Sequence, residues 1–134
     1  MHERILIVGD EQQNWMRDSL APEGFVVTIT DDANRGYEYL SESAFDLVVV
    51  NLDNSTSGLD FIKRIRANFE LRRVSILTIA EWGTGQPTMA LTEGADAFEP
   101  GPVGGDRLIA AVRKLLQPNL TMIALATGVE GELG

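Results

Sequence analysis

Carboxylate and amide side chains directly follow two of the apolar runs in this sequence. Asp10 and Glu11 come after the first run, whereas Asn51 and Asp53 come after the third. Oxygens of these types bind Mg²⁺ well, and a carboxylate can also attack phosphorus as a nucleophile. The sequence has no cysteine, and its only histidine is His2. Thiolate chemistry is therefore excluded, and histidine chemistry would depend on one residue beside the terminus.

Five short apolar runs position these side chains, and we interpret the runs as β-strands. They cover residues 5–8, 25–29, 47–50, 74–79 and, more weakly, 95–98. Each strong run is apolar without alternation, which is typical of strands buried on both faces in a parallel sheet between helices. We therefore expect a parallel sheet that is covered by helices on both sides.

Amphipathic segments lie between the apolar runs and predict five helices. We expect them around residues 15–21, from Asp31 or Asp32 onward, and around 59–66, 87–93 and 105–117. Gly36 should lie where the second helix approaches the sheet closely, and Trp15 and Met16 should pack in the core or at a helix edge. The basic residues of the third helix and its end are expected to be solvated rather than to bind nucleic acid: Lys63, Arg64, Arg66, Arg72 and Arg73.

The alternation of strands and helices predicts an α/β fold, a flavodoxin-like (βα)₅ doubly wound parallel sheet with strand order 2-1-3-4-5. We expect one domain over residues 1–117 and a C-terminal tail or linker stub over 118–134. In this fold, ligands bind beyond the carboxyl ends of the strands, between strands 1 and 3. Asp10 and Asn51 should therefore lie at the site.

Four motifs, in this order, resemble the receiver domain of two-component response regulators over residues 3 to about 117. They lie at residues 5–11, 45–51, 58–66 and 93–102. The resemblance implies the same flavodoxin-like fold, and a role as a receiver-like signal-transduction module in a phosphorelay. It does not imply an enzyme.

The family has five functional positions, which align with Gly9, Asp10, Asn51, Ala80 and Gly101. In the family they hold two acids that bind Mg²⁺, an acceptor aspartate, a threonine or serine switch, and a lysine. Only Asp10 matches, so the resemblance implies a degenerate pseudo-receiver that lacks the phosphoacceptor. An amide is a poor nucleophile for acyl phosphate formation, and Gly101 supplies no cation for the transferred phosphoryl group.

The leading hypothesis is a phosphorylation-independent module that binds proteins through the fourth helix, fifth strand and fifth helix. Its interface candidates are Trp82, Phe98 and Glu99, and Phe98 is expected to be fixed, facing inward above Ala80. The partner would be another protein or a fused output domain, with a homodimer also considered. No cofactor is expected, although a weak Mg²⁺ site at Asp10 and Asn51 is left open.

Two alternatives are kept open. The first is a phosphorylatable receiver that uses a displaced acceptor, Asp53, two residues beyond Asn51. The second is a small flavodoxin-like nucleotide binder, although neither phosphate-binding glycine motif, GxGxxG nor GxxxxGK[ST], occurs in the sequence. Phosphotransfer and nucleotide-induced thermal shifts would distinguish these alternatives from the leading hypothesis.

The charge balance and the hydropathy of the chain indicate which partners and which cellular location to expect. The formal net charge is −9, which disfavours nucleic-acid binding by this chain alone because phosphates would be repelled. No apolar run has the length of about 20 residues that a membrane span needs, and no targeting segment is recognised. We therefore expect a cytoplasmic protein without membrane contact.

Overall fold

A computed structural model of the chain describes residues 3–9, 14–52, 57–71, 73–80, 86–100 and 104–116. Five strands form one sheet in these residues: β1 (Arg4–Val8), β2 (Val26–Thr30), β3 (Leu47–Asn51), β4 (Ser75–Ala80) and β5 (Ala97–Pro100). All neighbouring pairs are parallel, and the order is β2-β1-β3-β4-β5. The predicted fold class and strand order are therefore confirmed.

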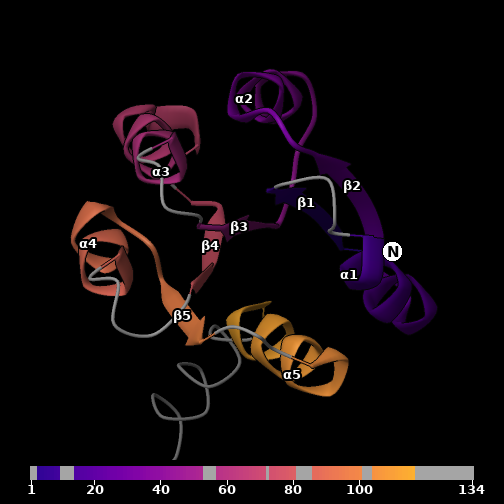
Figure 1. Cartoon of the computed structure of the whole chain (residues 1–134). Helices are drawn as coiled ribbons and strands as arrows, with labels where there is room; N and C mark the ends of the chain where they lie inside the picture. The colour runs from indigo at the N-terminus through magenta and orange to yellow at the C-terminus, as the bar shows by residue number, and fades with distance from the viewer. Residues whose placement is uncertain are drawn as a thin grey trace, which may run out of the picture.

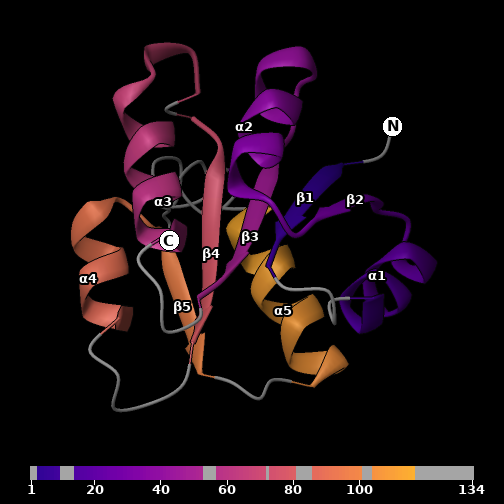
Figure 2. The same ribbon diagram turned by 45° about the horizontal axis from the view of Figure 1, so that its top comes forward.

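Helices cover both faces of the sheet (Figure 1). They are α1 (Asn14–Leu20), α2 (Ala33–Glu42), α3 (Ser57–Ala67), α4 (Gln86–Glu93) and α5 (Gly105–Leu116), with short 3₁₀ helices at Ala21–Glu23 and Phe69–Leu71. Helices α2, α3 and α4 lie on one face, and α1 and α5 lie on the other (Figures 1 and 2). Residues 118–134 lie outside the described residues, so the predicted tail stays a prediction.

Alternating side chains of the central strands supply both halves of the core. In β1, Leu6 and Val8 pack beneath α2 and α3, whereas Ile5 and Ile7 pack against α1 and α5. The four side chains are at most 5% exposed. This double burial explains why the strands are continuous apolar runs rather than alternating ones.

Two predictions for the start of α2 are confirmed. The side chain of Asp32 caps the helix by accepting a hydrogen bond from the Asn34 backbone N–H at 2.9 Å. Gly36 is buried, and a Cβ atom at this position would lie 2.9 Å from Cγ2 of Val8. The absence of a side chain at Gly36 therefore lets α2 approach β1.

The predicted solvent-facing position of Arg66 is wrong. Its side chain is only 19% exposed and donates hydrogen bonds to the carbonyls of Gly94 and Val74 and to the carboxylate of Asp96. Its guanidinium reaches those groups because α3 passes beside both the start of β4 and the turn after α4. Lys63, by contrast, is 64% exposed, as predicted.

The last strand begins two residues later than predicted, at Ala97, and it includes Glu99 and Pro100. The N–H of Ala95 bonds to the carbonyl of Ala90 at 2.9 Å, which ends α4. The carboxylate of Asp96 accepts a hydrogen bond from the backbone N–H of Ile76. Ala95 and Asp96 therefore belong to the turn that connects α4 to β5.

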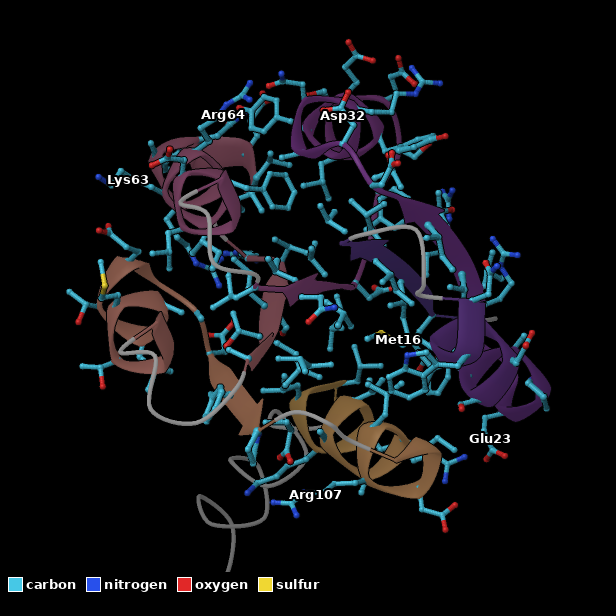
Figure 3. All side chains as sticks on the ribbon, viewed as in Figure 1. Met16, Glu23, Asp32, Lys63, Arg64 and Arg107 are labelled. Atoms are coloured by element: carbon cyan, nitrogen blue, oxygen red, sulfur yellow. The ribbon has the colours of Figure 1, made fainter. Side chains whose placement is uncertain are left out.

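The two side chains predicted to pack on the first helix differ in burial. Met16 is 1% exposed and belongs to the core beneath α1 and α5 (Figure 3). Trp15 is 37% exposed and lies at the edge of the helix. Both positions agree with the prediction of core or helix-edge packing.

Candidate functional site

The carboxyl ends of three neighbouring strands bring Gly9, Asn51 and Ala80 to one edge of the sheet. Residues of β1 and β3 pair up to Val8 and Val50, and Asn51 pairs with Ile79 of β4. The N–H of Gly9 donates to the carbonyl of Thr30 at 3.1 Å, which continues the ladder beyond β1. The topology thus places these three residues where the sequence predicts the site.

Asn51 is the last residue of β3 and is partly buried. The N–H of the next residue, Leu52, donates to the carbonyl of Ile79 at 2.8 Å. A Cβ atom at Gly58 would lie 2.6 Å from Cδ2 of Leu52, so the start of α3 packs closely on this strand end. Asn51 therefore stands at a strand end that is bonded to β4 and packed against α3, and its side chain is a neutral amide instead of a carboxylate.

Ala80 ends β4, where it is 3% exposed and pairs with Pro100. It belongs to the core beneath α2, α3 and α4, and Phe98 packs against the same core while partly buried. The position of Phe98 agrees with the expected inward orientation. That Phe98 is fixed there stays a prediction.

Several predicted site residues lie outside the described residues: Asp10, Asp53, Trp82 and Gly101. The weak Mg²⁺ site at Asp10 and Asn51 and the displaced acceptor Asp53 thus stay predictions. Within the described ranges, no group of three or more histidine, cysteine or carboxylate side chains is placed to hold a metal ion.

Helix α4 presents apolar side chains that the sequence interpretation missed. Met89 is 51% exposed and Leu91 is 48% exposed, on either side of the fully buried Ala90. Three consecutive apolar residues in a short helix cannot all face the core, because successive side chains lie about 100° apart. That pattern is the signal that could have identified the exposed surface.

A charged pair joins β5 to α5. Nε of Arg107 lies 2.6 Å from Oε1 of Glu99, and the Arg107 side chain is 65% exposed (Figure 3). Glu99, predicted as an interface residue, is less accessible, with 21% of its side chain exposed. Of this pair, the guanidinium of Arg107 is therefore the more accessible charge.

A depression of about 500 Å³ lies between α2 and α3, beside the carboxyl end of β2. Its lining includes the carboxylates of Asp31, Asp32 and Asp60, with Arg64 as its one basic group. The Arg64 guanidinium is held 4.1 Å from the centre of the Tyr37 ring and also donates to the Asn34 side chain. Three carboxylates make this depression unfavourable for a nucleotide phosphate.

Comparisons with known proteins agree on one family. A family model described as the response regulator receiver domain matches residues 5–113. The chain is 31% identical over 113 residues to the transcriptional regulatory protein DltR of Streptococcus agalactiae, covering 82% of this chain and 50% of DltR. It is 29% identical over 125 residues to the transcriptional regulatory protein CusR of Escherichia coli, covering 90% of this chain and 54% of CusR.

A solved structure supports the fold independently. The chemotaxis response regulator CheY4 of Vibrio cholerae matches with a TM-score of 0.79 at 18% identity, covering 87% of this chain and all of CheY4.

The chain spans about half the length of the curated relatives it matches. Among the helices that the structure describes, none has both the length and the apolar character of a membrane span.

Proposed function

The chain belongs to the response regulator receiver domain family, and we propose that it signals by binding a protein partner without being phosphorylated. One observation supports this proposal above all. Asn51 ends β3, at the position where the family resemblance places the acceptor aspartate. A receiver in which this position is an amide retains the scaffold and loses the nucleophile.

Phosphorylation of a receiver requires a carboxylate oxygen to attack phosphorus while cations neutralise the charge on the phosphoryl oxygens. The neutral amide of Asn51 is a poor nucleophile. Gly9 replaces one carboxylate of the Mg²⁺ pair, and Gly101 replaces the lysine. Ala80 has no hydroxyl that could follow the phosphoryl group. Acceptor, cation and switch are therefore lost at separate positions, and no single neighbouring side chain replaces all three.

The surface formed by α4, β5 and α5 is the proposed binding surface. The exposed side chains of these elements include Met89 and Leu91, on opposite sides of α4, and Arg107 of α5. Exposed apolar side chains are suited to the core of an interface, and an accessible guanidinium is suited to its charged rim. We propose that the partner is another protein or an output domain joined to this chain, with no enzymatic activity and no cofactor in the receiver itself.

Nuclear magnetic resonance with beryllofluoride, a phosphoryl mimic, tests this proposal. We expect the amide spectrum of the Mg²⁺-loaded protein to stay unchanged when beryllofluoride is added. Saturable shifts at Gly9, Asn51 and Phe98 would overturn the proposal. A titration with Mg²⁺ alone is the control, since shifts produced by the metal alone report the weak site at Asp10 and Asn51 rather than phosphoryl binding.

Two further measurements distinguish the alternatives. If beryllofluoride produces shifts that disappear in Asp53→Asn, the chain is a phosphorylatable receiver with a displaced acceptor. A nucleotide binder should instead gain thermal stability on addition of ATP, GTP or a flavin nucleotide. We expect neither response.

A further inference from the structure

Strand β2 forms one outer edge of the sheet and pairs only with β1 among the described elements (Figure 1). The N–H of Val26 donates to the carbonyl of Glu3 at 3.0 Å, and the carbonyl of Thr30 accepts from Gly9 at 3.1 Å. Backbone groups of successive strand residues point to opposite sides. The N–H and C=O groups of Val27 and Ile29 therefore point away from the sheet, where no described residue pairs with them.

The described residues of this edge lack the charged side chains, proline and bulges that often prevent two sheets from pairing. Natural edge strands are often protected by charged side chains, proline or bulges. The opposite edge, β5, contains Glu99 and Pro100, whereas β2 reads Val-Val-Thr-Ile-Thr and has neither a charge nor a proline. In addition, Val26 is 46% exposed. An uncharged strand of β-branched residues is thus available for pairing.

We propose that the β2 edge binds the β2 edge of a second copy of this chain, antiparallel around a two-fold axis at Thr28. In this register, Val27 lies opposite Ile29 of the second copy, and Ile29 lies opposite its Val27. All four residues direct their N–H and C=O groups outward, so each pair exchanges two hydrogen bonds. The result is a continuous sheet of ten strands.

The side chains and charges of the edge fit a second copy in this register. The exposed Val26 would lie opposite Thr30 of the second copy and be covered by it. Asp31 and Asp32 would lie opposite Phe25 and Gly24, so no carboxylate faces another directly across the interface. The net charge of −9 on each copy still opposes approach. Salt should therefore strengthen the dimer, whereas it would weaken an association based on ion pairs.

The β2 edge is separate from the proposed binding surface, because β2 and β5 are at opposite ends of the strand order. Figure 1 shows α4 and β5 on one side of the molecule and β2 on the other. A dimer at the β2 edge leaves α4, β5 and α5 free for another partner. The two proposals can therefore fail independently.

Sedimentation equilibrium of the full chain, at low and high salt, tests the dimer. We expect a concentration-dependent dimer whose dissociation constant falls as salt is added. Val27→Pro should abolish the dimer, since it removes an outward N–H and no bond of the β1–β2 ladder. Leu91→Lys, the matched control on α4, should leave it intact. A monomer at every concentration, or a dimer lost in Leu91→Lys and retained in Val27→Pro, would overturn the proposal.

Hydrogen exchange of the unmodified protein keeps the proposal testable if Val27→Pro does not fold. The Val27 and Ile29 amides should exchange at least about tenfold more slowly at concentrations where the dimer forms than where the monomer dominates. The Val26 amide, already bonded to Glu3, serves as an internal reference. Equal exchange of Val27 and Ile29 in both conditions contradicts pairing at this edge.

Discussion

Nη2 of Arg66 lies 2.8 Å from Oδ2 of Asp96, which joins α3 to the turn that precedes β5. The same guanidinium donates to the carbonyls of Gly94 and Val74, each at 2.8 Å. Asp96 also accepts a hydrogen bond from the backbone of Ile76. One side chain thus fixes the turn after α4 and the start of β4, and with them the base of the proposed binding surface.

Replacement of Arg66 by methionine should lower the free energy of unfolding by about 2–3 kcal/mol, since it leaves two carbonyls and a carboxylate without their donor. Urea denaturation measures this loss. Lys63→Met on the same helix is the control, with a change below about 0.5 kcal/mol, because the exposed Lys63 ammonium lies 3.8 Å from Glu93. Equal losses in the two variants would contradict the structural role of Arg66.

Gly36 is predicted to be irreplaceable by a larger residue. Gly36→Val should destabilise the protein by about 2–3 kcal/mol, because a Cβ there meets Val8 at 2.9 Å inside the packed core. Gly104→Ser is the matched control. No atom lies within 4 Å of a Cβ at Gly104, which immediately precedes α5, so serine should change stability by less than about 0.5 kcal/mol, toward a gain. A thermal melt of each variant checks both values.

The strands were predictable because a strand that is buried on both faces of the sheet consists of consecutive apolar residues. Residues 5–8 and 47–50 are continuous apolar runs, and their side chains are at most 5% exposed. The start of β5 was not predictable from hydropathy. Ala95 and Asp96 form a turn that hydrogen bonds define, and hydropathy does not record those bonds. Periodicity likewise assigns a charged side chain to the solvent. It cannot show that the Arg66 guanidinium meets two carbonyls.

Part of the candidate site was predictable from the sequence, and part was not. The strand order alone brings Gly9, Asn51 and Ala80 to the same edge of the sheet. The exposed apolar side chains of α4 were missed because hydropathy does not distinguish a buried Ala90 from an exposed Met89 or Leu91. Their exposure follows from how a short helix lies on the sheet, which is a tertiary property.

Leu91 should contribute to binding rather than to folding. Its side chain is 48% exposed, so Leu91→Lys should leave the free energy of unfolding within about 0.5 kcal/mol of the unmodified protein. Leu108→Ala on α5, which removes a fully buried side chain, should cost about 2–5 kcal/mol. Ordinary surface changes alter the free energy of unfolding by less than about 0.5 kcal/mol. A loss above about 1 kcal/mol in Leu91→Lys would therefore show that the helix needs this side chain for folding.

Restoring the lost groups should restore phosphorylation in steps. Asn51→Asp supplies a nucleophile, yet Gly9 and Gly101 still provide neither the second carboxylate nor the ammonium. We expect slow labelling by acetyl phosphate in the single variant. Labelling should be at least about a hundredfold faster when Gly9→Asp and Gly101→Lys are added, since loss of even one charge-stabilising group costs an enzyme about a hundredfold or more. Equal rates in the two variants would show that those positions do not limit the reaction.

Intact-mass spectrometry after incubation with acetyl phosphate and Mg²⁺ tests the central claim most directly. The unmodified protein should keep its original mass, while Asn51→Asp combined with Gly9→Asp and Gly101→Lys should gain the mass of one phosphoryl group and lose it on treatment with hydroxylamine. A hydroxylamine-sensitive phosphoryl adduct on the unmodified protein would contradict a receiver that signals without phosphorylation.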